Sequence, residues 1–272
     1  MKIALTATQS EVSGGPIIMR GSVSEAFALA SQLGYDGVEL HIHHPHRINR
    51  DEVKKLADKY GLGIPTLGTG MAATQEGLTF SHPDPDIRRR AVMRIKEHIA
   101  LAAHLNSAVT IGSMNGHLGN DPEKRPIHRE KALDCLKECL NVAADAGVTI
   151  LLEPLNRYEC DYLNTLEEGV RVIRQIGMPS LKLLADTFHM NIEEADITAS
   201  LCTAGPKLGH VHLADSNRQA PGYGHLDVRG VLRVLRDIGY QEYLSFEILP
   251  LPNFRQAAED AIRKVKKILS KL

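Results

Sequence analysis

Eight short runs of residues typical of β-strands recur along the chain, and each is followed by a segment with helical spacing of apolar residues. Successive runs begin between 27 and 44 residues apart, which is the length of one strand–helix unit. The runs are Ile3–Ala7, Gly37–His41, Ile64–Gly68, Ala108–Gly112, Val148–Pro154, Leu181–Thr187, Leu208–Ala214 and Leu244–Leu249. Eight such units in 272 residues predict an α/β fold, a single (β/α)8 TIM barrel that occupies residues 1–272 as one domain.

An open, doubly wound sheet is the alternative arrangement of alternating strands and helices, and it normally carries a glycine-rich phosphate loop after its first strand. The segment after the first run, TQSEVSGG, contains neither GxGxxG nor GxxxxGK followed by Ser or Thr. No Pro/Ser-rich linker or block of charge divides the chain. The closed barrel is therefore the favoured prediction.

Charge and composition exclude several classes of partner. The chain has 32 basic and 33 acidic residues and a formal net charge of −1, so it has no global basic field for nucleic acid or an anionic membrane. No apolar run approaches the ~20 residues that span a bilayer, and the N-terminus leads into a strand without a signal-like segment. We therefore expect a cytoplasmic protein, with cysteines that are reduced rather than paired or zinc-bound: Cys135, Cys139, Cys160 and Cys202.

Helix starts are marked by capping signals. Ser22 with Glu25, and Thr165 with Glu168, fit the capping box, in which each side chain accepts a hydrogen bond from the other residue's amide. Asn253 precedes a last segment with apolar residues at helical spacing. These signals predict helices that begin at the residue after Ser22, Thr165 and Asn253.

Ionisable side chains lie near the carboxyl ends of the last four predicted strands: Glu153, Asp186, His212 and Glu247. Each is embedded in apolar sequence, and burying one carboxylate without a partner costs several kcal/mol or forces its protonation. In a TIM barrel these strand ends meet at the face where active sites lie. We therefore expect the four groups to lie close together and to need a common explanation.

A single divalent cation provides that explanation, because three carboxylates and one imidazole would share one positive centre. Buried ion pairs are the structural alternative, but only one arginine lies near these strand ends. An oxygen-rich set without thiolate is not typical of a structural zinc site. It suits Mn2+, the expected ion, or Co2+ or Mg2+, and Zn2+ stays open.

The second half of the chain resembles a known family. The motifs EPLNRYE (153–159), ADTFHMNIEE (185–194), HVHLADSNRQAPGYGHLD (210–227) and FE (246–247) carry the resemblance, and their spacing also matches. The chain resembles the xylose isomerase-like TIM-barrel superfamily of sugar isomerases and epimerases. Within it, the chain is most similar to ketose 3-epimerases of the D-tagatose 3-epimerase/D-psicose 3-epimerase type.

The resemblance implies an isomerase that inverts C3 of a ketose, a ketohexose or ketopentose, through a metal-bound enediolate. It places Glu153, Asp186, His212 and Glu247 at the metal-ligand positions. Glu153 and Glu247 double as the catalytic acid/base pair, which exchanges protons on opposite faces of the planar intermediate. Substrate oxygens are bound at three further positions: Glu159, His189 and Arg218. The family resemblance also implies a homo-oligomer, a dimer or tetramer.

Other activities on the same scaffold stay open. A hydroxypyruvate-type isomerase, a ketose–aldose isomerase and a metal-dependent oxo-acid decarboxylase each need an enediolate beside a metal. The superfamily also contains apurinic endonucleases, but here TLGTG and TIGSM end two earlier strands without the extra histidines those enzymes need. A non-catalytic sugar-binding protein would not require two metal-bound carboxylates at one carbon.

Several further features permit two interpretations. The run HIHHPH is expected to be a surface loop with one or two histidines in the pocket, rather than a second metal site: His41, His43, His44 and His46. Segment 68–80, GTGMAATQEGLTF, is a candidate pocket wall. Gly222 and Gly224 could cradle a phosphate or serve only as turn residues. Glu39 could face either the barrel axis or the helices.

Overall fold

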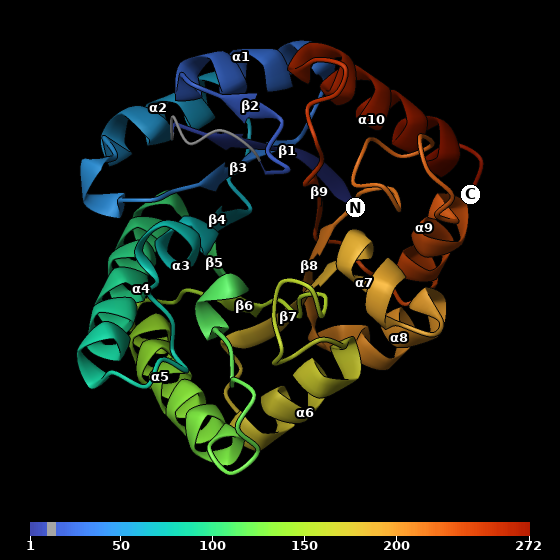
Figure 1. The fold of residues 1–272 in the computed structure, drawn as a ribbon. Helices are drawn as coiled ribbons and strands as arrows, with labels where there is room; N and C mark the ends of the chain where they lie inside the picture. Colours follow the sequence, from blue (N-terminus) through green and yellow to red (C-terminus); the bar gives the residue numbers. More distant parts are fainter. Residues whose placement is uncertain (10–14) are drawn as a thin grey trace.

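The computed structural model describes residues 1–9 and 15–272 and contains a closed ring of parallel strands (Figure 1). Neighbouring strands follow the order of the chain, and β1 pairs with β9 to close the ring. In this part of the chain the ring consists of β1 (Lys2–Thr8), β3 (Gly37–His41), β4 (Thr66–Gly68), β5 (Ala108–Ile111), β6 (Ile150–Leu152), β7 (Leu181–Asp186), β8 (Leu208–His212) and β9 (Tyr243–Phe246). The predicted (β/α)8 barrel is confirmed.

Helices surround the ring of strands (Figure 1). The outer helices are α1 (Val23–Leu33), α2 (Arg50–Tyr60), α4 (Pro85–Leu105), α5 (Arg125–Asp145), α6 (Leu166–Ile176), α8 (Ile197–Ala204), α9 (Val228–Asp237) and α10 (Phe254–Leu269). Two short helices follow strand ends directly, α3 (Gly70–Glu76) after β4 and α7 (Thr187–Glu193) after β7. Three single turns of 3-10 helix are also described: η1 (Pro45–Arg47), η2 (Ser113–Asn115) and η3 (Gly205–Lys207).

The strands are mostly shorter than their predicted runs, and the chain keeps its direction past them. Glu153 follows β6, yet its amide still donates to the carbonyl of Ile111 at 3.0 Å. The amide of Leu213, one residue past β8, donates to Ser245 at 2.9 Å. The sequence did not predict β2 (Met19–Arg20), a two-residue strand that pairs with the end of β1.

All three predicted helix starts are confirmed, and the capping side chain makes its hydrogen bond at two of them. Thr165 and Glu168 form the expected capping box at α6, and the Asn253 side chain accepts from the amide of Gln256 at α10. Ser22 does precede α1, but its side chain makes no capping hydrogen bond, so the predicted box with Glu25 is wrong. The sequence pattern therefore located the start of α1 without fixing the contact that stabilises it.

The barrel interior carries polar side chains in place of a purely apolar filling. In β3, Glu39 is completely buried and contacts histidines of β8 across the barrel, so it faces the axis. Its neighbours Val38 and Leu40 point to the opposite side of the strand, where the helices pack. The apolar core between the ring and the helices is thus separate from a polar column along the axis.

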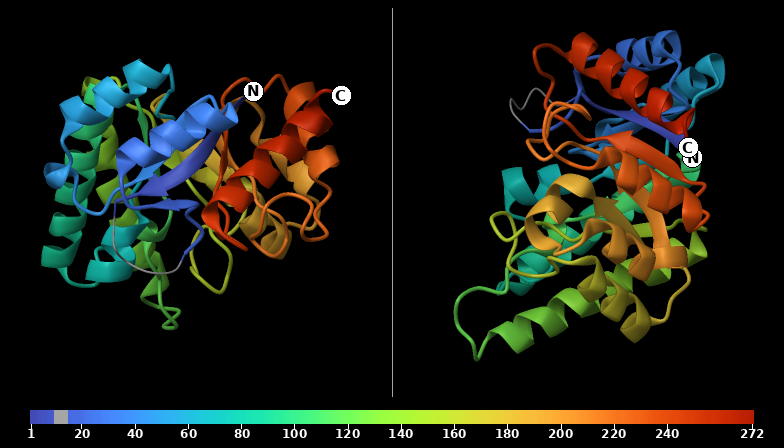
Figure 2. Two further views of the ribbon diagram at one scale, coloured as in Figure 1. Left: turned by 90° about the horizontal axis from the view of Figure 1, so that it is seen from above. Right: turned by 90° about the vertical axis from the view of Figure 1, so that its right-hand side faces the viewer.

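The ends of the chain lie on one side of the barrel. Both termini are at the end opposite the loop that follows β8, drawn in orange (Figure 2).

All four cysteines are free, as expected, and three of them are buried. Within residues 1–9 and 15–272, no helix has the length and apolar character needed to cross a membrane.

Candidate active site

The four predicted ligand residues come together at the carboxyl ends of neighbouring strands. Glu153 follows β6, Asp186 and His212 end β7 and β8, and Glu247 follows β9. Each offers one ligand atom within 4.8 Å of the other three. All four side chains are buried, and the most exposed, Glu247, is 9% accessible. The arrangement could hold a metal ion, and the ligand role of each residue stays a prediction.

Two buried polar atoms without a hydrogen-bond partner indicate what kind of group the cluster could bind. Oδ2 of Asp186 and Nδ1 of His212 are buried and have no hydrogen-bond partner. The other polar atom of each side chain is already used: Asp186 Oδ1 accepts from the amide of Phe188 at 2.8 Å, and His212 Nε2 lies 2.9 Å from Glu39 Oε1. Buried unsatisfied polar groups are costly and call for a missing partner. Carboxylate oxygens beside one imidazole nitrogen are a donor set that fits a divalent cation.

The carboxylates gather around one imidazole nitrogen. His212 Nδ1 lies 3.3 Å from Glu153 Oε1 and 3.7 Å from Glu247 Oε2. Burial lowers the pKa of His212, but the charges of Glu39 and Glu247 prevail and hold it well above its usual value. Burial raises the pKa of Asp186 to about 8, against the opposing charge of Arg218. Both groups therefore hold a proton more tightly than usual, and a divalent cation could replace the positive charge that these protons provide.

Arg218 spans the carboxylates from the loop after β8. Its Nη2 lies 2.6 Å from Glu247 Oε2 and 3.5 Å from Asp186 Oδ2, and its Nη1 lies 3.3 Å from Glu159 Oε1. Burial raises the pKa of Glu247, but the Arg218 charge overrides this and brings it to about 2. The guanidinium also lies 4.5 Å from the ring centre of Phe188. Arg218 is therefore held in place as a cation at the edge of the cluster.

His189 presents one defined tautomer toward the cavity. Its Nδ1 accepts from the backbone amide of Asn156 at 3.2 Å and lies 2.7 Å from the Asn156 side-chain nitrogen. Burial and the Arg218 charge lower the pKa of His189 to about 4, so the ring is neutral. A neutral ring that accepts at Nδ1 carries its proton on Nε2, which can donate to a ligand. The side-chain nitrogen of Asn156 also donates to Glu159 Oε1 at 2.9 Å, fixing that carboxylate.

These groups line one cavity of about 390 Å3. Glu153, His212 and Glu247 lie on its wall together with the three residues predicted to bind substrate: Glu159, His189 and Arg218. The opposite wall comes from the first half of the barrel and includes Thr69, Met71 and Gln75. These belong to segment 68–80, so the structure places the predicted pocket wall at the cavity.

The loop after β8 is built around the buried carboxylate of Asp215. It accepts from the amides of Ser216 at 2.7 Å, Gly222 at 2.6 Å and Leu226 at 3.0 Å. A Cβ at Gly224 would lie 2.3 Å from the same carboxylate, so only glycine fits there. An internal anion thus uses the Gly222 amide, and this favours the turn interpretation over the phosphate cradle.

The histidine run divides between two places. His41 lines the cavity, as expected for one member of the run. His43 stacks on His44 with ring centres 3.9 Å apart and bonds Glu76 Oε1 at 2.9 Å. Arg94 contacts both oxygens of Glu76, at 2.7 and 3.2 Å, and neutralises this carboxylate. Although these histidines and Glu76 are close enough to share an ion, the arginine already provides the positive charge.

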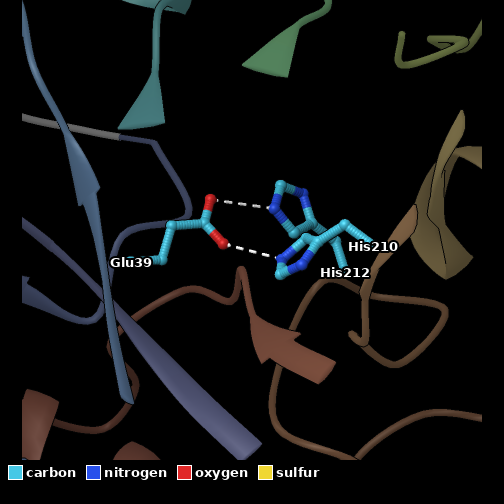
Figure 3. Close-up of side chains that lie close together, drawn as sticks. All are labelled: Glu39, His210 and His212. Carbon is cyan, nitrogen blue, oxygen red and sulfur yellow. Dashed lines mark hydrogen bonds and ion pairs between the residues drawn. The ribbon is translucent and has the colours of Figure 1, made fainter. Parts of the chain in front are cut away.

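Glu39 is the site residue that the sequence left unassigned. It faces His210 and His212, and each of these rings is joined to one of its carboxylate oxygens (Figure 3). His41 Nε2 is a third neighbour, 3.0 Å from Glu39 Oε1. The spacing of Glu39 and His41, two residues apart in one strand, was the available signal that both face the axis.

Comparison with known proteins gives the family context. The profile of the Xylose isomerase-like TIM barrel family matches residues 27–268. A D-psicose 3-epimerase of Ruminiclostridium cellulolyticum is 34% identical over 203 residues, which cover 74% of this chain and 68% of that protein. The resemblance predicted from the motifs is confirmed at the level of the family, and this relative is an epimerase.

Solved structures agree with this relationship. The structure of an L-ribulose 3-epimerase superposes with a TM-score of 0.85 at 26% identity, covering 99% of this chain and 95% of that one. A 3-keto-D-glucoside 4-epimerase from E. coli superposes with a TM-score of 0.82 at 26% identity, covering 98% and 99%. Both named proteins are epimerases, which belong to the isomerase class.

Proposed function

The chain belongs to the xylose isomerase-like TIM barrel family, and we propose that it is a metal-dependent ketose 3-epimerase acting on a ketohexose or ketopentose. One observation carries the proposal: two carboxylates from separate strand ends, Glu153 and Glu247, lie 3.3 and 3.7 Å from the same orphaned imidazole nitrogen at the wall of a cavity. The named relatives that act on ketoses support the choice of substrate class.

The ligands in this proposal are Glu153, Asp186, His212 and Glu247, with Mn2+ as the expected ion and Co2+, Mg2+ or Zn2+ as alternatives. When bound, a divalent cation polarises the carbonyl of a ketose and stabilises negative charge that develops on its oxygens. The gathering of three buried carboxylates and one imidazole, with ligand atoms within 4.8 Å of one another, supports this assignment.

The two glutamates perform the proton transfers. Inversion at C3 requires one group to take the proton from one face and another to return a proton to the opposite face. Glu153 comes from the end of β6 and Glu247 from the end of β9, so they approach from different sides. General acid–base groups of this kind each contribute about 10²–10⁴-fold to the rate.

Three residues orient the sugar. Arg218 and the Nε2–H of His189 donate to substrate oxygens, and the positive charge of Arg218 favours the oxygen that becomes negative. Glu159 accepts from a sugar hydroxyl at the same wall. A neutral His189 suits this role because it donates without adding a second cation beside Arg218.

Exchange of the C3 proton tests the proposal. The protein is incubated with D-psicose or L-ribulose in D2O and Mn2+, and the sugar is followed by NMR. We expect deuterium at C3 together with the C3 epimer, and loss of both after EDTA treatment. Absence of deuterium at C3 with Mn2+ and with Co2+ would refute the assignment.

The same spectra separate the alternatives. Deuterium at C1 of the ketose, with formation of an aldose, indicates a ketose–aldose isomerase. Exchange of the C3 protons of hydroxypyruvate for deuterium indicates an isomerase of that type. Release of CO2 from a sugar-derived oxo acid indicates a decarboxylase. Exchange at C4 of 3-keto-D-glucoside, with none at C3 of the ketoses, indicates the activity named for the E. coli structure.

Variants of the two glutamates test their roles. Glu153→Gln and Glu247→Gln should each lose C3 exchange at saturating Mn2+, since an amide cannot take up the proton. Turnover like that of the wild type in either variant removes that glutamate from the acid/base pair.

A homo-oligomeric state, a single domain over residues 1–272 and a cytoplasmic location stay predictions.

A further inference from the structure

A single carboxylate in the barrel interior faces three imidazole rings. Glu39 is 0% exposed, and its Oε1 lies 3.0 Å from His41 Nε2 and 2.9 Å from His212 Nε2. Its Oε2 lies 3.0 Å from His210 Nε2 (Figure 3). The three contacts come from β3 itself and from β8, across the interior of the barrel.

The chemistry of these contacts defines where the protons are. An ionised carboxylate only accepts hydrogen bonds, so each Nε2 that contacts it must carry a hydrogen. Three Nε2 atoms face the two oxygens of this one carboxylate at 2.9 to 3.0 Å, an arrangement that suits its ionised, accepting form. His212 therefore has its hydrogen on Nε2 whenever the ring is neutral.

The opposite nitrogen of His212 is the one that faces the cluster. Nδ1 has no hydrogen-bond partner and lies 3.3 Å from Glu153 Oε1. A hydrogen fixed on Nε2 leaves the lone pair of a neutral ring on Nδ1, pointing at the carboxylates. A hydrogen bond to the distal nitrogen of a ligating histidine sets its tautomer and orientation and raises its basicity.

We propose that Glu39 is a positioning residue of the cation site: it fixes His212 so that Nδ1, and not Nε2, is offered to the ion. This inference rests on the proposed metal dependence and adds a residue outside the four ligands. Glu39 does not touch the cation or the sugar, and it acts only through His212.

His41 extends the same arrangement toward the sugar side. Its Nε2 shares Oε1 of Glu39 with His212 and lies 3.9 Å from Glu247 Oε1. Oε1 of Glu39 therefore sets the orientation of two rings: His212, the proposed metal ligand, and His41 on the cavity wall. The Cβ of any larger residue at Gly68 would lie 2.6 Å from His41 Nδ1, so the ring is confined on its other side.

Binding of Mn2+ to Glu39→Gln tests the proposal by isothermal titration calorimetry. The amide keeps the size of the side chain but removes its charge and one acceptor oxygen. We expect Mn2+ to bind about 10- to 100-fold more weakly than in the wild type. Glu76→Gln is the matched control, since Glu76 also accepts from a histidine Nε2 but lies outside the four-ligand cluster. Its Mn2+ affinity should equal that of the wild type, and an equal affinity in Glu39→Gln overturns the proposal.

The tautomer gives a second readout that needs no variant. In wild-type protein with 15N-labelled histidine and bound Zn2+, we expect His212 to carry its proton on Nε2 and to bind through Nδ1. Coordination through Nε2 overturns the proposal, whatever the stability of Glu39→Gln. Neither measurement uses sugar turnover, so a wild-type protein that binds metal but does not exchange C3 refutes the proposed function alone.

Discussion

Gly112 leaves room for the Glu153 carboxylate, and replacing it with alanine tests the geometry of the proposed cation site. A Cβ at Gly112 would lie 2.5 Å from Glu153 Oε2, whereas ordinary contacts begin at 3.4 Å. The oxygen must therefore move by about 0.9 Å, the difference between these two distances. Metal–ligand distances tolerate only about 0.2 Å, so this shift would move the Glu153 carboxylate out of place among the four proposed ligands. We expect Mn2+ to bind about 10- to 100-fold more weakly, equivalent to roughly 1.4–2.8 kcal/mol.

The assay is calorimetric titration of Gly112→Ala with Mn2+, after circular dichroism has established that the variant is folded. Gly70→Ala is the control, because its Cβ would lie 3.7 Å from Ser113 Oγ, an ordinary contact on the same cavity wall. Its Mn2+ affinity should match that of the wild type. The reasoning is refuted if folded Gly112→Ala binds Mn2+ within about twofold of the wild type.

Three further predictions concern other contacts. Arg218→Lys should raise the KM for the ketose about tenfold or more in steady-state assays, since one ammonium cannot span the carboxylates that the guanidinium bridges; an unchanged KM contradicts this. Asp215→Asn should lower the free energy of unfolding in urea at pH 7 by about 1–3 kcal/mol. The asparagine side chain cannot accept hydrogen bonds from all the backbone N–H groups that the carboxylate binds. Backbone hydrogen bonds outweigh burial and lower the pKa of Asp215, so its contribution is present above the carboxyl pKa of the unfolded chain, about 3.9. The difference between Asp215→Asn and wild type should therefore shrink as the pH falls below that value, and a difference independent of pH would argue against the carboxylate. In the same assay Thr165→Ala should lower the free energy of unfolding by about 1 kcal/mol. Ser22→Ala should lower it much less, because Ser22 makes no capping hydrogen bond. Equal losses would show that the capping hydrogen bond is not the cause.

The sequence predicted the barrel well because the strand–helix alternation is local information. Each run of β-branched and apolar residues signals its own strand, and the number of units then leaves few topologies. The two-residue strand β2 could not be found, because its pairing depends on where the end of β1 lies in space. Ser22 has the sequence of a capping box, but the hydrogen bond depends on local geometry that the pattern does not contain.

The candidate site was predictable where the residue type conflicts with its surroundings. Glu153, Asp186, His212 and Glu247 are ionisable groups in apolar strands, and barrel geometry brings strand ends together. Glu39 lies in an equally apolar strand, but two of its three histidine partners are in β8, 171 and 173 residues along the chain. A contact over that distance follows from the closure of the barrel, and no local pattern reports it.

The two halves of the barrel contribute different things to the site, and this affects how variants of the protein can arise. The four candidate ligands come from β6 to β9, whereas Thr69, Met71 and Gln75 of the facing wall follow β4. Recombination that replaces the first half with that of a relative would change the cavity wall that a bound molecule meets. The four candidate metal ligands would stay the same. Glu39 is the exception, because it lies in the first half and contacts His212 in the second. A chimaera that keeps the proposed cation site would need a carboxylate at this position, so one side chain couples the two halves.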